Sequence, residues 1–301
     1  MGTKTLYVIG NGFDLHHGMP TNFSDFKQFL RQVDQEAYDW TENYVPASGD
    51  WSNLEQALAE LDTDNIVSDM ECFLGSYSSD DWSDSGHHDF QYEIDRVATG
   101  LSHTLKERFA EWTRSIPVPE RNEVPGSLAN LDINATFLTF NYTSTLTHLY
   151  GVHAENILHI HGEASDADSD IVLGHGWAEE ERPLLYNSVD PESADHRLLE
   201  AYLTLDEYFR STFKPSDKII QDNLDFFEQL GEIEEVIAFG HSMAQVDVAY
   251  FAKLTASFGD RPIRWTFVLP PREEHQKNLK SNVTKIGFPP ERVSFKTWAQ
   301  L

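Results

Sequence analysis

Five short stretches of this 301-residue sequence are rich in glycine or in amide, imidazole, hydroxyl and carboxylate side chains, and each follows an apolar run. These side chains donate, accept or transfer protons, and glycine lets the backbone approach a ligand closely. In open α/β sheets ligands bind beyond the carboxyl ends of the strands, so polar clusters at such ends predict one convergent site. The five are Gly10-Asn11-Gly12-Phe13-Asp14, Asn141-Tyr142-Thr143, His161-Gly162, Gly174-His175-Gly176 and Gly240-His241-Ser242.

The first cluster indicates a turn at which backbone N–H groups could hold phosphates. It is not the dinucleotide fingerprint Gly-x-Gly-x-x-Gly, because the third glycine position holds Leu15. A tight structural turn accounts for Gly10 and Gly12 equally well. Asp14 fits either a ligand-binding carboxylate or a cap of the following helix.

The amide of Asn141 and the imidazole of His161 also have structural explanations. Asn141 fits the N-cap of a helix, and His161 fits a histidine that only forms hydrogen bonds in the core. His159 lies two residues before His161, and in a strand both side chains would point to the same face. The sequence therefore leaves open which of the two histidines is functional.

Two further positions near the end of the chain have the same ambiguity. Ser242 and Asp247 fit either caps of the last large helix or contacts to a ligand. We expect His175 and His241, which adjoin glycines, to line the site.

Apolar runs of strand length precede these clusters, and helical patterns alternate with them. Residues 51–62 read as a helix in which Ser52 and Glu55 form a capping box. The alternation predicts a Rossmann-like, three-layer, mostly parallel α/β fold, a single domain over 1–301 with a mostly helical insertion at about 24–128. The expected strands are 5–10, 135–140, 156–160, 171–173, 235–239, 263–269 and 293–298.

The composition excludes several classes of protein. The net charge is −28, with 22 Lys and Arg against 50 Asp and Glu, which argues against direct nucleic-acid binding and anionic membrane surfaces. The single cysteine, Cys72, allows no internal disulfide. No apolar run is long enough to span a membrane, and the N-terminus lacks the pattern of a secretory signal. We therefore expect a cytoplasmic protein.

The ordered blocks GNGFDLHHGMPTNFSDF, TFNYTSTLTHLY, NILHIHG, LGHG and FGHSMAQVDVAYF resemble the AbiH family of phage-defence proteins along nearly the whole chain. The resemblance implies a role in abortive infection, a response that stops phage spread, but it implies no particular reaction. The activating trigger, whether a phage product or a protein partner, stays open. So does assembly into a homo-oligomer.

The same order of blocks is similar, more distantly, to sirtuin-like proteins that bind or cleave NAD. This resemblance implies NAD as the ligand, with no metal, and a hydrolase of the NAD-glycohydrolase kind. The Cys-x-x-Cys zinc module of deacylating sirtuins is absent, which argues against lysine deacylation. The resemblance implies that Asn141 and His161 are the catalytic pair and that Gly10, Gly12, Gly240 and Ser242 line the nucleotide. Asn11 and Asp14 depart from the sirtuin-like pattern, and we expect them, with Asp247, to line the nucleotide as well.

Cleavage of the nicotinamide–ribose bond develops oxocarbenium character, as in other glycoside hydrolysis. Within the NAD interpretation, Asn141 would orient the ribose and an attacking water. His161, with an ordinary pKa of about 6.5, would act as general base.

Two alternatives remain. His159, His161, His175, His241, Asp14 and Asn141 could form the metal site of a phosphoesterase or nuclease, although no Asp-x-His block stands directly at the end of the first strand and the bridging Asp with a matching Asn-His pair is missing. The other alternative is a non-catalytic module that senses a nucleotide or binds a protein.

Overall fold

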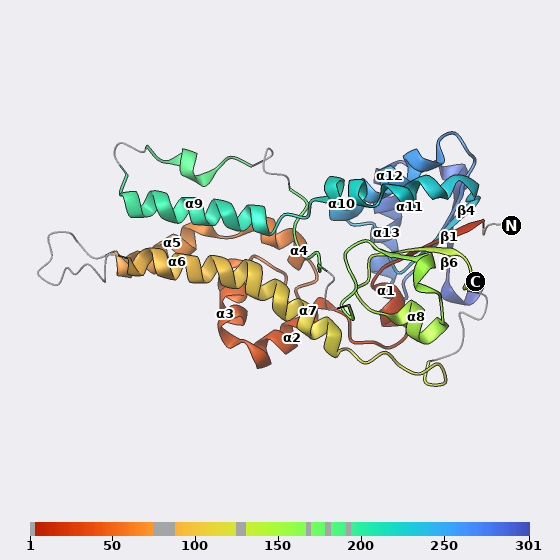
Figure 1. Cartoon of the computed structure of the whole chain (residues 1–301), viewed down its shortest axis with the longest axis horizontal. Coiled ribbons are helices and arrows are strands. Elements are labelled where there is room, and N and C mark those ends of the chain that lie inside the picture. Colours follow the sequence, from red (N-terminus) through yellow and green to blue (C-terminus); the bar gives the residue numbers. More distant parts are fainter. Residues whose placement is uncertain (1–3, 75–87, 125–130, 167–169, 178–181, 191–193) are drawn as a thin grey trace, which may run out of the picture. The chain divides into compact units, whose positions relative to one another are not determined.

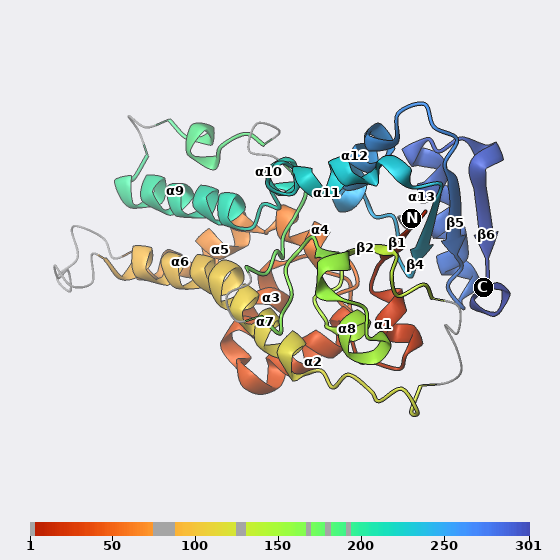
Figure 2. The same ribbon diagram turned by 45° about the vertical axis from the view of Figure 1, so that its right-hand side comes forward.

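The computed structural model describes residues 4–74, 88–124, 131–166, 170–177, 182–190 and 194–301. Its strands form one six-stranded sheet in which every neighbouring pair is parallel (Figures 1 and 2). This confirms the Rossmann-like α/β fold. The strands are β1 (Thr5–Ile9), β2 (Thr136–Thr139), β3 (Ile157–His159), β4 (Glu235–Phe239), β5 (Arg264–Val268) and β6 (Val293–Lys296).

The strand order is β3-β2-β1-β4-β5-β6, so the chain adds strands on one side of β1 and then on the other. This reversal is the topological switch point at which open α/β sheets bind their ligands. Ile9, the last residue of β1, is in register with Thr139 of β2 and Phe239 of β4. The three strands therefore end level, and the residues that follow them meet at one edge of the sheet.

Alternating side chains of the strands build two separate cores, as the two-residue period of a strand requires. Leu6 and Val8 belong to the core on one face, and Tyr7 and Ile9 belong to the core on the other. The sheet is thus the middle of three layers. The helices of the first face are α10 (Ser216–Asp222), α11 (Leu224–Glu228), α12 (Val248–Phe258) and α13 (Glu273–Ile286), and those of the second are α1 (Gly12–His16) and α8 (Thr145–Tyr150).

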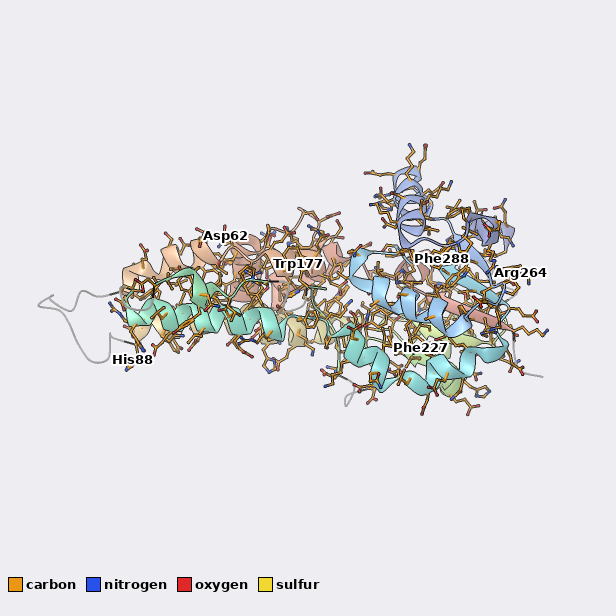
Figure 3. The ribbon with its side chains drawn as sticks, turned by 90° about the horizontal axis from the view of Figure 1, so that it is seen from above. Asp62, His88, Trp177, Phe227, Arg264 and Phe288 are labelled. Atoms are coloured by element: carbon orange, nitrogen blue, oxygen red, sulfur yellow. The ribbon has the colours of Figure 1, made fainter. Side chains whose placement is uncertain are left out.

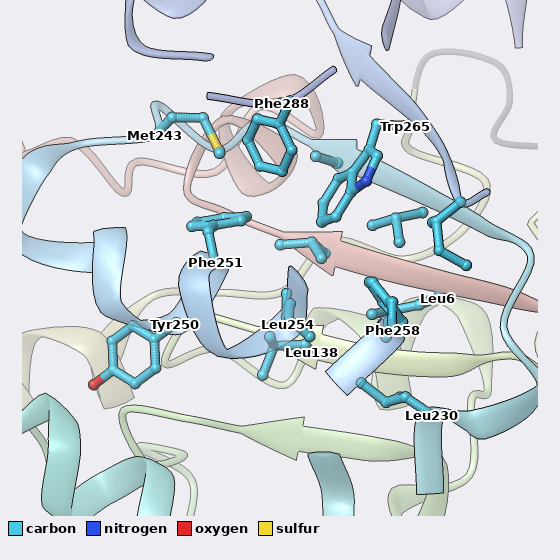
Figure 4. Close-up of a cluster of buried hydrophobic side chains, with 14 of the residues drawn as sticks. Leu6, Leu138, Leu230, Met243, Tyr250, Phe251, Leu254, Phe258, Trp265 and Phe288 are labelled. Atoms are coloured by element: carbon cyan, nitrogen blue, oxygen red, sulfur yellow. The ribbon is translucent and has the colours of Figure 1, made fainter. Parts of the chain in front are cut away.

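The larger of these cores is rich in aromatic side chains. Phe251 and Leu254 of α12 pack with Leu138 of β2 and Trp265 of β5, as Figure 4 shows in close-up. Phe227, labelled in Figure 3, belongs to the same core. This packing holds α12 and the loop before it against the strand ends.

The chain divides into two compact units. The sheet unit comprises Met1–Asn22, Ala110–Val172 and Pro215–Leu301, and the helical unit comprises Phe23–Phe109 and Leu173–Lys214. Helices were expected at about 24–128, and they occupy Phe23–Ser115. The sequence did not indicate that a second, later segment joins the helical unit. The helices of this span and segment are α2 (Phe23–Val33), α3 (Gln35–Tyr44), α4 (Leu54–Ala57), α5 (Thr63–Met70), α6 (Asp89–Thr99), α7 (Leu105–Ser115) and α9 (His196–Ser211).

The expected strand at 171–173 is wrong. This segment does not join the sheet: the N–H of Val172 donates to the carbonyl of His161 at 2.9 Å, and an isolated bridge pairs His175 with Phe213 just beyond the segment. The N–H of His175 donates to the carbonyl of Thr212 at 2.9 Å, and the N–H of Lys214 donates back to the carbonyl of His175 at 2.8 Å. Three apolar residues are too few to distinguish a strand from a short extended link.

None of the helices in the described part of the chain is both long and apolar enough to cross a bilayer.

Candidate functional site

Buried polar side chains gather after β1, β2, β3 and β4, at the carboxyl edge of the sheet in the sheet unit. Burying polar groups costs free energy unless they are paired, so such a concentration makes this edge of the sheet a candidate functional site. We call this set the strand-end site. Its buried members are Asp14, Thr139, Asn141, Thr145, His161, His241 and Asp247, and the half-buried Thr143 joins them through its hydrogen bond to Asp14.

Glycines let the turns after β1 and β4 pack backbone against backbone. A Cβ on Gly10 would lie 2.6 Å from the Cα of His241, and one on Gly12 would lie 2.7 Å from the Cα of Gly240. Gly240 itself has φ +63°, and its Cβ would meet the Phe13 nitrogen at 2.2 Å. No larger residue fits at these three positions.

The backbone N–H groups of these turns already donate hydrogen bonds to backbone carbonyls. Gly10 donates to the carbonyl of Phe239 at 2.8 Å, Gly12 donates to that of Gly240 at 2.9 Å, and Phe13 donates to that of Gly10 at 2.8 Å. These glycines therefore have the structural role that the sequence left open. A nucleotide contact at Gly10, Gly12 or Gly240 stays a prediction, and it would have to involve groups other than these three N–H donors.

Asn11 is exposed, and its amide donates to the carbonyl of Thr21 at 2.8 Å, which ties the start of α1 to the loop after it. Asp14 does not cap α1, because it lies inside the helix. Its carboxylate is 1% exposed and accepts a hydrogen bond from the Thr143 hydroxyl at 2.5 Å. Thr143 in turn accepts from Thr145 at 3.1 Å.

Burial raises the pKa of Asp14 to about 6, against the opposing effect of the Thr143 and Thr145 hydroxyls and the Asn141 amide. A carboxyl group that titrates near neutral pH is typical of functional sites.

Asn141 is 6% exposed and continues β2 into the site. It does not cap α8, whose N-cap is Ser144. Among the described residues, its amide nitrogen and the Oδ1 atom of Asp14 have no hydrogen-bond partner. The amide lies near enough to the Asp14 carboxyl group to lower its pKa without the geometry of a hydrogen bond. An unpaired buried donor thus lies near an unpaired buried acceptor.

His159 and His161 have different surroundings. His159 is the last residue of β3, its Nδ1 lies 3.1 Å from the Asn141 carbonyl, and its Nε2 lies 3.8 Å from Glu163. His161 lies in the turn beyond the strand, so the expectation that both side chains share a strand face does not apply. His161 packs edge-on against Phe140 and Tyr250.

Asp247 lies between two buried histidines. Its Oδ1 is 3.9 Å from Nε2 of His161, and its Oδ2 is 3.5 Å from Nε2 of His241. The carboxylate occupies the N-cap of α12 without a capping bond to the described backbone. Ser242 is exposed, and its carbonyl accepts a hydrogen bond from Asn282 at 3.1 Å.

His175 belongs to the helical unit. Its Nδ1 accepts from the N–H of Trp177 at 3.2 Å, so its Nε2 donates to the carbonyl of Phe209 at 3.1 Å. Burial lowers the pKa of His175 to about 4. The ring is therefore neutral and fully hydrogen-bonded within its own unit, which gives it a structural role. That it lines the site stays a prediction.

No group of three or more His, Cys, Asp and Glu side chains in the described ranges could hold a metal ion. The histidines that the phosphoesterase alternative requires are thus not arranged as a ligand set in this part of the chain.

Sequence reasoning missed one member of the site and one residue that supports it. Thr145 is a hydroxyl that supports Thr143, and Met243, whose N–H donates to His241, has φ +57°, which is unusual for a residue with a side chain. Thr145 alternates with Asn141 and Thr143 in the sequence, and this spacing was a usable signal. No sequence pattern indicated the backbone conformation of Met243.

A parallel sheet in the order 3-2-1-4-5-6, with buried polar residues at its switch point, defines a Rossmann-like α/β protein. The model of the family described as bacteriophage abortive infection AbiH matches residues 6–269. The chain belongs to this family, and membership implies a role in abortive infection of phage-infected cells. Comparison with curated proteins and with solved structures gave no match.

Proposed function

We propose that this AbiH protein binds NAD or a related nucleotide at the strand-end site and hydrolyses its nicotinamide–ribose bond during abortive infection. The observation that carries the proposal is the unpaired amide of Asn141 near the unpaired carboxyl oxygen of Asp14. An unsatisfied buried group costs about 1–3 kcal/mol, and a ligand that pairs both groups recovers this energy.

A hydroxyl group satisfies both partners at once, because it accepts from the Asn141 amide and donates to the Asp14 carboxylate. Adjacent hydroxyls are the distinguishing polar feature of ribose. The Thr143 hydroxyl occupies the other oxygen of Asp14, so the carboxylate is held in a fixed orientation for this contact.

The reaction then uses the histidine beyond β3. The C1′–N bond breaks, and its electron pair leaves with nicotinamide, which becomes neutral. The oxygen of a water molecule bonds to C1′, and His161 takes the proton that this water releases. The products are nicotinamide and ADP-ribose. General-base assistance of this kind contributes about 10²- to 10⁴-fold in rate.

Chromatography of NAD incubated with the purified protein tests the reaction, and a thermal-shift titration with NAD tests binding. We expect Asn141→Ala and His161→Ala to abolish nicotinamide release while the melting temperature stays within a few degrees. Asn134→Ala and His153→Ala, which remove the same side-chain types at exposed positions of the sheet unit, are the matched controls.

If the purified protein binds NAD without cleaving it, the assay is repeated in phage-infected cells that express it. Binding without NAD loss in those cells would favour the non-catalytic sensor. If the protein shows no NAD binding and the infected cells show no NAD loss, the proposed function is refuted.

A further inference from the structure

We infer that Asp247 is a positioning residue for His161: its carboxylate, anchored by His241, orients the His161 imidazole and stabilises the protonated ring. The inference adds a residue to the proposed function and rests on it, because the proposed function makes His161 the general base. It also departs from the expectation that Asp247 contacts the nucleotide.

The geometry of the three side chains is the first argument. The two oxygens of Asp247 face Nε2 of His161 at 3.9 Å and Nε2 of His241 at 3.5 Å. The histidine side chains are each 3% exposed and that of Asp247 is 12% exposed. Since water screens charges poorly at such buried positions, the carboxylate acts on both rings.

Hydrogen bonding fixes the tautomer of His241. The N–H of Met243 donates to Nδ1 of His241 at 2.9 Å, so this nitrogen must be unprotonated. The proton of the neutral ring is then on Nε2, which faces Asp247. Protonating Nδ1 would break the bond from Met243. His241 therefore stays neutral and anchors the carboxylate, and His161 is the ring that changes charge.

Backbone strain supports the same arrangement. Met243 adopts φ +57° although it has a side chain, a conformation that costs of the order of 1–3 kcal/mol. Its side chain is buried in the core with Tyr250 and Phe251 of α12, as labelled in Figure 4. This packing holds the strained loop so that the Met243 N–H reaches His241.

Aromatic rings hold the imidazoles in place. Phe140 packs edge-on against both, with ring centroids 5.2 Å from His161 and 4.3 Å from His241. The titratable groups that face His161 from the packed elements are Asp247 and Tyr250 at the start of α12, Tyr142 after β2 and, beyond Phe140, His241. Among these groups of the described residues, Asp247 is the only carboxyl group, so we expect it to decide the effect on His161.

Titration of the imidazoles by NMR tests the inference without any assay of NAD. With resonances assigned from His161→Gln and His241→Gln, we expect the midpoint of His161 to fall by about 1 pH unit or more in Asp247→Asn, because an opposite charge at this distance is removed. Glu163→Gln is the matched control. Its carboxylate lies 3.8 Å from His159, so it should shift His159 and leave His161 unchanged.

An unchanged His161 midpoint in Asp247→Asn would overturn the inference. The NMR chemical shifts of the imidazole nitrogens in the wild-type protein provide a second test. This test does not depend on whether a variant folds. We expect His241 to carry its proton on Nε2 and to leave Nδ1 unprotonated. A proton on Nδ1 would contradict the argument.

If the protein cleaves NAD, Asp247→Asn should lower kcat about tenfold with little change in KM, and the acid limb of the pH profile should move to lower pH. A rise in KM alone would instead identify Asp247 as a nucleotide contact. If the wild-type protein neither binds NAD nor lowers NAD in infected cells, the proposed function is refuted, while the titration still decides whether Asp247 acts on His161.

Discussion

Asp14 offers a stringent test of how the strand-end site is built, because its burial changes the dependence of stability on pH. Burial raises its pKa to about 6 in the folded protein, whereas an Asp in the unfolded chain titrates near its ordinary value of 3.8. The stability that the protonated group contributes is fully present below pH 3.8, and it is lost as the pH rises through about 6. The difference of about two pKa units corresponds to about 3 kcal/mol.

Most of this loss falls between pH 4 and pH 7, where linkage gives a change of roughly 2 kcal/mol for this group. Asp14→Asn cannot ionise and removes the dependence. We therefore expect the free energy of unfolding of Asp14→Asn, minus that of the wild type, to rise by about 2 kcal/mol from pH 4 to pH 7. Taking this difference cancels the other titrating groups of the chain.

Urea unfolding followed by tryptophan fluorescence measures both free energies at half-unit steps of pH. Asp260→Asn, at an exposed position of the sheet unit, is the control for the same substitution made away from the site. A flat difference for Asp14→Asn, within about 0.5 kcal/mol, would show that Asp14 ionises like an ordinary surface carboxylate. Such a result would refute the burial of the Asp14 carboxyl group away from water.

Two further substitutions test the scaffold. Gly240→Ala forces a side chain into a positive-φ position and against the Phe13 nitrogen, so we expect a loss of roughly 3 kcal/mol or more in the free energy of unfolding. Gly231→Ala, where the added Cβ meets no atom within 4 Å, should change it little. Tyr150→Phe removes the hydroxyl that donates to Nε2 of His17 at 2.5 Å, and thermal unfolding should report a loss of about 1–3 kcal/mol. An unaltered melting temperature in either Gly240→Ala or Tyr150→Phe would contradict the corresponding contact.

The strands were the most predictable elements, because their signal is local. Runs such as TLYVI and EVIAF are continuous and rich in β-branched and aromatic residues, and they end at glycine. The structure places β1 and β4 within one residue of the expected ranges.

Predictions from a local sequence pattern failed where a long-range contact uses the same side chain. The capping box expected at Ser52 and Glu55 does not form, since α4 begins after Asn53 and the Glu55 carboxylate instead lies 3.1 Å from the buried ammonium of Lys214. A buried ammonium needs a nearby carboxylate far more than a helix end needs one more capping bond. Residues 159 apart in the chain cannot be paired from spacing alone.

The sequence by itself determined the six strands of the sheet and the polar residues that follow four of them, because apolar periodicity and glycine act over a few neighbouring residues; the seventh expected strand, at 171–173, did not form. Only the tertiary structure decided which of those residues meet. It brings Asp247 between His161 and His241 and Asp14 beside Thr143, and it places His175 within the other unit. These pairings depend on strand order, on close backbone packing at glycines and on the burial of whole faces. None of these is a property of a short stretch of chain.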